Sequence, residues 1–346
     1  MDLSPDPIQE RLAKAVDDAL SGARDPTVEL AAIGVPALCL PEEVGGYALG
    51  LGADVIVHGR LGYALETMPA DRETVLCLEL AGPTAVPDEL RAGLLDGTAH
   101  AAVSGTLGDS SLRTDPAGRL WGKSEPLPGG NYRFVVGRAP SGRGSGWFAA
   151  VPNSGTCRTE PCSRLGSPHV RLTFEGAPAT ALDVSSDAAQ AAVERARVRQ
   201  AAVLHGIADR ALETARAHVN RRNQYGAPLL DLQSVAHRLA TLVGDGEGWR
   251  LMLHETAWRH DRGAQRPGDG TLVLAAAAEH ALTCTRLAIQ LHGARGMLAN
   301  STAAAAYRVA SVEATRMGPP QSLWVESGRI PQAAPGAPAR QQFSTV

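Results

Sequence analysis

The C-terminal half of the sequence carries four long stretches with an apolar stripe at helical spacing. We predict helices at about 188–222, 229–262, 271–291 and 301–317. All four are longer than the usual helix of about 11–12 residues. Each stripe must be buried against a neighbour, so four such helices joined by short turns favour an antiparallel bundle.

The sequence before this bundle changes character near His100. Between His100 and about Val184, short apolar runs with period-two alternation are separated by turn residues, which predicts a small antiparallel sheet or barrel. Upstream, apolar residues recur at helical spacing, with Ser4-Pro5 as a start signal. The upstream helices are predicted at about 8–20, 26–32, 53–66, 72–80 and 88–95.

These changes divide the 346 residues into four parts. We predict an N-terminal α-helical domain at 1–98, a middle β domain at 99–185, a C-terminal four-helix bundle at 186–330 and a disordered tail at 331–346. A chain of this length is long enough for two or three domains, since one domain takes roughly 100–200 residues.

The composition is that of a soluble globular protein, with 44% hydrophobic and 20% charged residues. A formal net charge of -3 indicates no nucleic-acid binding. The N-terminus is amphipathic and acidic, unlike a signal peptide. We find no run near the roughly 20 apolar residues of a membrane span. An odd number of cysteines, without metal-binding spacing, favours reduced thiols in the cytoplasm and predicts no metal site.

The segment from Arg222 to Gln233 is the first candidate for binding. Gly226 and Pro228 indicate a turn between two long helices. Arg222 just before the turn, and Gln233 about a turn and a half into the second helix, could both face one anionic ligand. An ordinary helical hairpin with a solvated arginine is the alternative interpretation.

Three motifs give the chain a resemblance to a known family. IGVPALCLPEEVGG at 33–46, RNQYG at 222–226 and QLHGARG at 290–296 stand in one order along the chain. With them the sequence resembles the acyl-CoA dehydrogenase family over about residues 1–330. The resemblance implies the fold of that family: an α-helical domain, a small β domain and a four-helix bundle.

The resemblance also implies an FAD site shared across a subunit interface. A bidentate arginine suits the pyrophosphate of FAD, and amide groups suit its adenosine. At one motif position the family has a second glycine where this chain has Ala294. For Gln290 and His292, an interhelical hydrogen bond is the alternative. The residues that the resemblance assigns to FAD are Arg222, Gln224, Tyr225, Gln233, Gln290 and Gly293.

Family members need a carboxylate base that removes the α-proton of a thioester. The resemblance places this base at one of two positions, which here are Met317 and Ala196. Neither residue is acidic, so we name no catalytic residue. Glu194 and Glu313 stand nearby in sequence but on other helical faces, as surface carboxylates would.

The β segment departs from the family as well. In the family a loop of this segment contacts the flavin ring. Here SGTLGDSS at 104–111 stands in its place, and only Gly108 and Ser110 keep loop character. Trp147 could stand near a second flavin loop, although a tryptophan of the β core is the simpler interpretation.

The chain is therefore most similar to the shortened subunit, lacking the base, of actinobacterial heteromeric acyl-CoA dehydrogenases acting on steroid side chains. We expect a subunit that helps to hold FAD, while a paralogous subunit supplies the base for oxidation of an acyl-CoA thioester. The alternatives are a self-sufficient homo-oligomer, acting as a carrier-protein thioester dehydrogenase or a flavin oxygenase, and a cofactor-free scaffold.

Overall fold

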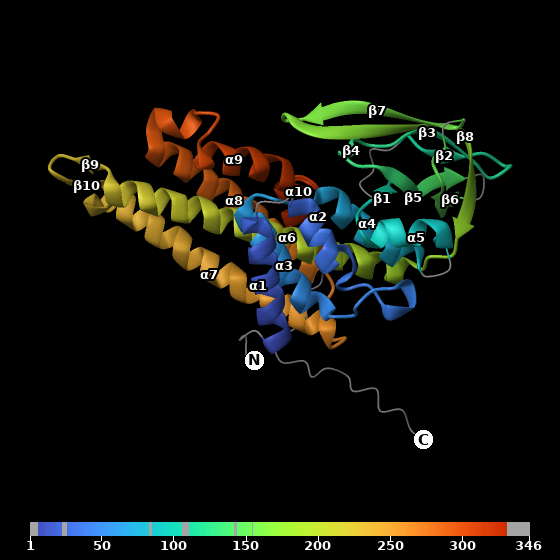
Figure 1. Cartoon of the computed structure of the whole chain (residues 1–346), viewed down its shortest axis with the longest axis horizontal. Coiled ribbons are helices and arrows are strands. Elements are labelled where there is room, and N and C mark those ends of the chain that lie inside the picture. Colours follow the sequence, from blue (N-terminus) through green and yellow to red (C-terminus); the bar gives the residue numbers. More distant parts are fainter. Residues whose placement is uncertain are drawn as a thin grey trace, which may run out of the picture.

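The computed structural model has three parts in chain order: a helical N-terminal part, a β sheet and a long helical bundle (Figure 1). It describes residues 6–22, 26–82, 85–105, 111–141, 144–153 and 155–330. The predicted disordered tail and the Ser4-Pro5 start signal lie outside these ranges. The boundaries of the domains stay a prediction, although α5 ends at Leu95 and β1 begins at His100.

Among the described residues of the N-terminal part there are five α-helices, at positions close to those predicted. The first begins one residue after Asp6, whose carboxylate accepts hydrogen bonds from the Ile8 and Gln9 N–H groups. Asp6 and Gln9 thus form a capping box, with Pro7 at the first helical position. The helices are α1 Pro7–Ser21, α2 Pro26–Ile33, α3 Gly50–Ala64, α4 Pro69–Ala81 and α5 Asp88–Leu95.

The β part is one eight-stranded sheet built around the long strand β8. One end of β8 pairs with β6, and the rest pairs with β3, β4 and β7. The strands are β1 His100–Ser104, β2 Arg113–Thr114, β3 Arg119–Lys123, β4 Leu127–Pro128, β5 Tyr132–Ser141, β6 Gly144–Ala150, β7 Cys157–Arg164 and β8 Ser167–Leu182.

One pairing differs from the antiparallel sheet that the sequence predicts. Strands β1 and β5 run parallel, with Val103 opposite Val136. A parallel pair needs a long connection, and the intervening chain, which includes β2, β3 and β4, provides it. The other pairings are antiparallel.

The bundle is built from long helices, and its last segment is shorter than predicted. Helix α9 ends at Glu313 rather than near Met317, and a further helix, α10, follows Pro319. Pro320 occupies the first position of α10, where a missing N–H costs nothing. The helices are α6 Ser186–Arg221, α7 Gln233–Asp261, α8 Asp269–His292, α9 Thr302–Glu313 and α10 Pro320–Arg329.

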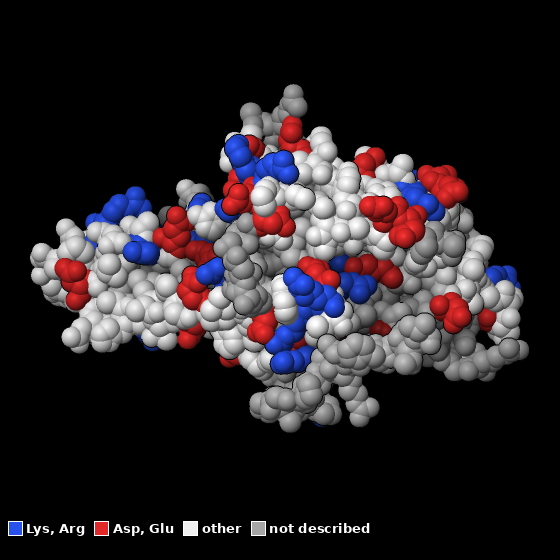
Figure 2. Space-filling model, turned by 90° about the horizontal axis from the view of Figure 1, so that it is seen from below, with Lys and Arg blue, Asp and Glu red and all other residues white. Residues whose placement is uncertain are grey.

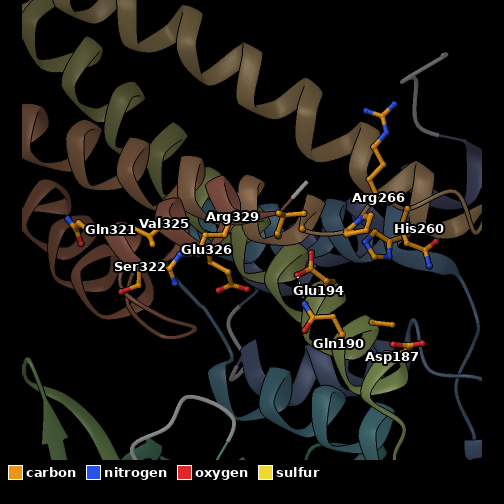
Figure 3. Close-up of a pocket in the computed structure, with 15 residues that line it drawn as sticks. Asp187, Gln190, Glu194, His260, Arg266, Gln321, Ser322, Val325, Glu326 and Arg329 are labelled. Carbon is orange, nitrogen blue, oxygen red and sulfur yellow. Dashed lines mark hydrogen bonds between the residues drawn. The ribbon is translucent and has the colours of Figure 1, made fainter. Parts of the chain in front are cut away.

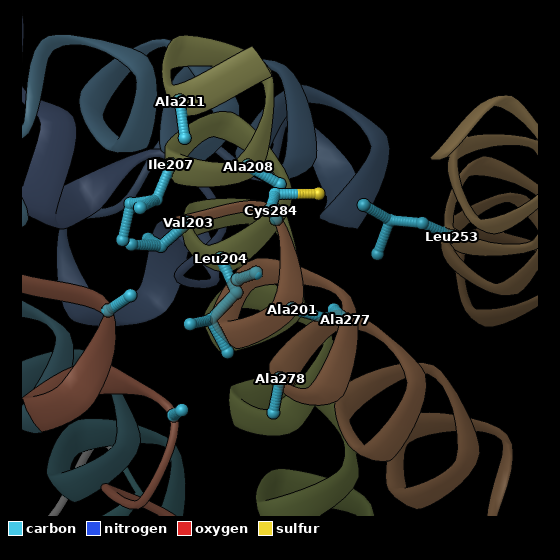
Figure 4. Packing of buried hydrophobic residues seen from close by; sticks show 14 of the residues in the cluster. Ala201, Val203, Leu204, Ile207, Ala208, Ala211, Leu253, Ala277, Ala278 and Cys284 are labelled. Carbon is cyan, nitrogen blue, oxygen red and sulfur yellow. The ribbon is translucent and has the colours of Figure 1, made fainter. Parts of the chain in front are cut away.

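The stretch Asp269–Met297 is long and apolar enough to cross a membrane, judged by length and composition alone. The prediction that the sequence holds no such run was therefore wrong. In the structure, 61% of its most apolar window is buried. Helix α8 packs against α6 (Figure 4), so it is a core helix of the bundle.

Small side chains let the central helices approach closely. Alanines of α6 and α8 alternate with larger residues such as Leu204 and Ile207 in the core (Figure 4). Helix α3 crosses α6 at Gly62 and Gly206, where a Cβ on either glycine would collide with backbone of the other helix. The N-terminal part is thereby held directly against the bundle.

The face seen from below mixes charges of both signs (Figure 2). Lysine and arginine side chains lie among aspartates and glutamates over this face, with no area of one sign extending across it. Lys14 with Asp18 and Arg60 with Asp17 are exposed pairs of opposite charge.

Replacing Gly206 by alanine should lower the free energy of unfolding by about 1–3 kcal/mol, as overpacking does. The added Cβ would collide with the Gly59 carbonyl oxygen. Gly244→Ala on α7 is the matched control, because no heavy atom lies within 4 Å of its added Cβ. It should be neutral or stabilising by up to about 1 kcal/mol. Denaturant unfolding measures both, and similar losses would contradict the close crossing.

Candidate functional site

A pocket of about 1080 Å³ lies where the β part, α4 and the bundle meet. This volume is slightly above the roughly 300–1,000 Å³ typical of small-molecule sites. Its walls come from segments far apart in the sequence, so only the tertiary fold assembles it. Residues that line it include Glu73, Leu76, Glu125, Arg164, Arg171 and Met317.

The structure brings together the two positions at which the sequence comparison places a base. Met317 lies in the turn between α9 and α10, and Ala196 lies on α6. Both line a cavity of about 20 Å³ behind the main pocket, which has room for about one water molecule. Neither side chain can accept a proton, so neither of these two positions provides a base.

Glu313 is buried and fully engaged rather than exposed on a helix surface. Arg72 Nη2 donates to its Oε2 at 2.7 Å, and Arg316 donates to both oxygens at 3.0 and 2.9 Å. Gln200 Nε2 adds a bond at 2.9 Å. Burial raises the pKa of Glu313, but the two guanidinium groups outweigh it and hold the pKa well below its ordinary value. A carboxylate held in this way is a poor proton acceptor.

Glu194 is likewise buried, and it caps the start of α8. Its carboxylate accepts the Gly270 N–H at 2.7 Å and the Thr271 N–H at 3.3 Å. The side chains of Gln190 and Arg197 bind its other oxygen. These contacts are structural. The prediction of surface carboxylates is wrong for both Glu194 and Glu313, because each is buried.

The main pocket has a basic wall. Arg164 on β7 donates to the Thr315 hydroxyl at 2.7 Å. Burial lowers the pKa of the Arg164 guanidinium. The Nε of Arg171 on β8 is buried without a hydrogen-bond partner among the described residues. Arg316 closes the same wall. An anionic ligand group, such as a phosphate, would satisfy these donors.

The segment from Arg222 to Gln233 forms a tight hairpin rather than a plain helical turn. Tyr225 and Gly226 both have positive φ, at 54° and 84°, between the two-residue strands β9 Asn223–Gln224 and β10 Ala227–Pro228. Two such residues are characteristic of a type I′ turn. Gln233 is therefore the first residue of α7, not a turn and a half inside it.

This hairpin is highly exposed. Tyr225 has 94% of its surface exposed, and within the described residues Arg222 forms no ion pair. A large exposed aromatic side chain on a residue with positive φ is unusual. The arrangement leaves a guanidinium, two amides and a ring available to a ligand or to another subunit.

The second motif lies beside the hairpin. The rings of His218, near the end of α6, and His292, at the end of α8, stack with centroids 4.2 Å apart. Gly293 follows with φ 59° and ψ -141°, a conformation suited to glycine. Gln290 is exposed in a groove between α7 and α8. The six residues that the sequence assigns to FAD thus gather at one end of the bundle.

The hairpin end lies at the opposite end of the molecule from the β part, which forms one wall of the main pocket (Figure 1). Ala196 and Arg221 lie 25 residues apart on the single helix α6, which corresponds to about 38 Å at 1.5 Å per residue. An extended dinucleotide does not span this distance. The hairpin and the pocket of one chain therefore cannot serve the same bound cofactor molecule.

A second large cavity, of about 1170 Å³, lies on another side of α6 (Figure 3). It is bounded by the start of α6, the connection between α7 and α8, and α10. His260 lines it, and burial lowers the pKa of this histidine. The sequence assigned no site residue to this cavity. Glu194, which borders it, already caps α8.

The flavin-loop candidates have separate outcomes. Gly108 and Ser110 lie outside the described residues. Trp147 on β6 packs, partly buried, against the core shared by α4, β1 and β5, so its contacts are those of a core tryptophan.

Sequence reasoning missed the residues that shape the main pocket, above all Glu73. This residue stands three positions before Leu76 on α4, so it interrupts an apolar face. An acidic residue on such a stripe was the signal available. The arginines of β7 and β8 carried no comparable signal, because they stand in no motif.

Comparison with known proteins identifies the C-terminal part. Residues 186–324 match the family described as acyl-CoA dehydrogenase, C-terminal domain. The acyl-CoA dehydrogenase IpdE2 of Mycobacterium tuberculosis is 27% identical over 263 residues, covering 75% of this chain and 72% of the relative. An L-prolyl-[peptidyl-carrier protein] dehydrogenase of Pseudomonas fluorescens is 36% identical over 95 residues, covering 27% of this chain and 24% of the relative.

Solved structures share the fold over nearly the whole chain. The ChsE4-ChsE5 complex from Mycobacterium tuberculosis superposes with a TM-score of 0.80 at 21% identity, covering 95% of this chain and 98% of that chain. The Tcur3481-Tcur3483 steroid ACAD G363A variant gives 0.80 at 22% identity, with 93% and 96% covered. In sequence, the first five curated relatives are matched over only 19% to 33% of their lengths.

The Glu313→Gln variant should lose about 3–5 kcal/mol of stability, because breaking a buried pair leaves charges uncompensated. Glu247→Gln is the matched control, since Glu247 and its partner Arg250 are 59% and 44% exposed. That pair should contribute about 0–1 kcal/mol. Chemical unfolding at pH 7 measures both.

The effect of Glu313 has a defined pH dependence. Its folded pKa is lowered, so its stabilisation is present above the unfolded pKa of about 4.3 and is lost as pH falls below that value. A loss from Glu313→Gln that matched Glu247→Gln at pH 7 would contradict the buried network.

Proposed function

The chain belongs to the acyl-CoA dehydrogenase family, and on that premise we propose that it is a subunit of a heteromeric, FAD-dependent acyl-CoA dehydrogenase. A paralogous partner subunit supplies the catalytic base, and the product is an α,β-enoyl thioester. The observation that carries this proposal is the pair Met317 and Ala196, because both line one cavity and neither can take up a proton.

The hairpin end of the bundle is the proposed binding surface for FAD. Arg222 pairs with the pyrophosphate, while Gln224, Gln233 and Gln290 hydrogen-bond to the adenosine side. Tyr225 stacks on the cofactor, and Gly293 allows close backbone approach. When bound, FAD accepts the hydride from the β-carbon of the substrate. Ala294 adds one methyl group at the surface next to Gly293.

The separation of about 38 Å along α6 supports a site shared between subunits. The hairpin of one subunit holds the distal part of an FAD whose flavin lies in the pocket of its neighbour. The exposure of Tyr225 fits this arrangement, because an aromatic residue at an interface becomes buried on assembly.

An acyl-CoA thioester is the proposed substrate class, with a steroid side-chain thioester as its first candidate. The likeness to the steroid ACAD structure and to the ChsE4-ChsE5 complex supports this choice. The basic wall formed by Arg164, Arg171 and Arg316 suits a ligand that carries phosphates. We place the assembly in the cytoplasm.

A self-sufficient dehydrogenase of carrier-protein thioesters is the second candidate. The segment that is 36% identical to the L-prolyl-[peptidyl-carrier protein] dehydrogenase favours it. Such an enzyme would be a homo-oligomer that reduces its flavin with a carrier-bound substrate and no paralogue.

Co-expression with a paralogue that keeps an acidic base tests the proposal. The two chains should copurify with about one FAD for each heterodimer, and the complex should oxidise acyl-CoA. A homo-oligomer that binds FAD and oxidises a thioester alone would sink the heteromeric proposal.

Arg222→Ala in the complex should weaken FAD binding about 10- to 100-fold, because an ion pair to a phosphate contributes about 1.5–3 kcal/mol. Arg221→Ala is the neighbouring control, since Arg221 donates to the Ala217 carbonyl of its own helix. Titration of the apo complex with FAD, followed by flavin fluorescence, measures both. Equal affinities for the two variants would remove Arg222 from the site.

A further inference from the structure

We propose that Glu73 is a proton acceptor in this chain's own pocket, placed to remove the α-proton of a thioester. The proposal takes its substrate class from the proposed function and goes beyond it, because it gives this subunit a carboxyl group of its own. Glu73 lies on α4 and lines both the main pocket and the small cavity behind it. Among the described residues it is the one acidic residue on both.

The small cavity shows where Glu73 lies relative to the two expected base positions. Met317 and Ala196 line the same cavity, so Glu73 approaches from α4 the point that a base at either position would approach from the bundle. The position of the carboxyl, not its place in the sequence, decides which proton it can reach. Helix α4 thus supplies the carboxyl group that the Met317 and Ala196 positions lack.

The surroundings of Glu73 leave it able to take up a proton near neutral pH. Burial and, to a smaller extent, the Glu125 carboxylate raise its pKa, which with all neighbours included is about 7. Arg316 in the turn after α9, Arg72 on its own helix and the Val103 N–H on β1 act in the opposite direction. A base with a pKa near the working pH is efficient in both uptake and release.

Helix α6 also faces this cavity, through Arg199 and Gln200. Both are committed elsewhere: Arg199 Nε donates to Asp54 at 2.5 Å, and Gln200 Nε2 donates to Glu313. Arg199 also pairs with Glu79. Arg199 therefore does not neutralise Glu73 by a direct ion pair, and Gln200 carries no charge.

The other acids of the main pocket are engaged. Glu125 accepts hydrogen bonds from the Ser104 hydroxyl at 2.5 Å and the Gly105 N–H at 3.2 Å. Glu326 pairs with Arg197 at 2.7 Å. Both are held as acceptors, which leaves Glu73 as the carboxyl with the fewest fixed contacts.

The proton step is complete without an oxidant. The α-C–H bond breaks, its electron pair delocalises onto the thioester carbonyl, and the proton binds a Glu73 oxygen. Reversal returns a proton to the α-carbon. In D₂O each cycle replaces the α-hydrogen by deuterium, so exchange reports the base separately from the oxidation.

The test uses the FAD-loaded complex in which the partner's base has been changed to glutamine. The probe is 3-thiaoctanoyl-CoA, whose sulfur at the β-position acidifies the α-C–H and prevents desaturation. Mass spectrometry follows deuterium uptake. The wild-type chain should catalyse exchange, and Glu73→Gln should lower the rate at least about 100-fold, in the range for a general base. The exchange rate should rise with pH to a plateau, with a midpoint about pH 7.

Glu89→Gln, an exposed residue in the first turn of α5, is the control and should keep the wild-type rate. Glu73→Asp keeps a carboxyl group one methylene farther away and should retain partial exchange. A rate unchanged in Glu73→Gln, or no exchange in the wild-type chain, would overturn the proposal for Glu73 while leaving the heteromeric dehydrogenase intact. Failure of the proposed function would instead appear as absence of copurification and of acyl-CoA oxidation.

Thermal melting provides a readout that does not depend on the probe. Because the folded pKa of Glu73 is raised to about 7, wild-type stability should fall as pH rises from the unfolded value of about 4.3 through 7. Glu73→Gln lacks this loss, so its melting temperature should gain on the wild type at pH 8 relative to pH 5. An equal difference at both pH values would count against the raised pKa on which the base depends.

Discussion

A carboxylate held between two buried guanidinium groups joins α4 to the bundle beside the pocket. Glu313 at the end of α9 binds Arg72 of α4 and Arg316 of the following turn, and Gln200 of α6 completes the set. Burying these charges is costly, and only mutual pairing with full hydrogen bonding offsets the loss of hydration. The network therefore fixes α4 against the bundle. Its side chains also fill the space beside Met317 and Ala196, where only about 20 Å³ stays open.

The order of the elements could be predicted because helical and strand periodicity are local properties. The predicted α5 matches Asp88–Leu95, and α6 differs by only a few residues at its start. The errors arose where local signals compete. Asp6 replaced the expected start signal because its side chain caps two N–H groups. Strand β7 shows another limit of local signals: most of its side chains are exposed, which weakens the alternation that marks a strand.

The candidate site could be predicted only in part, because a sequence shows local patterns but not contacts made by the tertiary fold. The Arg222 hairpin and the segment after Gln290 stand in short motifs, so a local pattern could single them out, although their binding role stays a prediction. Glu73 has no such motif. Its neighbours Glu125, Val103 and Arg316 lie on other elements, and only the packing of α4 against the β part makes its carboxyl unusual. The absence of an acid at Met317 was visible in the sequence, but the cavity that Met317 shares with Ala196 was not.

Helix α6 also limits how the sequence can change. It is one uninterrupted helix from Ser186 to Arg221, so it sets both the spacing and the relative orientation of the pocket and the hairpin. One inserted residue would advance the hairpin by about 1.5 Å and turn it by about 100°. Insertion of seven residues, close to two whole turns, would nearly restore the orientation yet displace the hairpin by about 10 Å. The number of residues in α6 is therefore fixed by the geometry at its two ends.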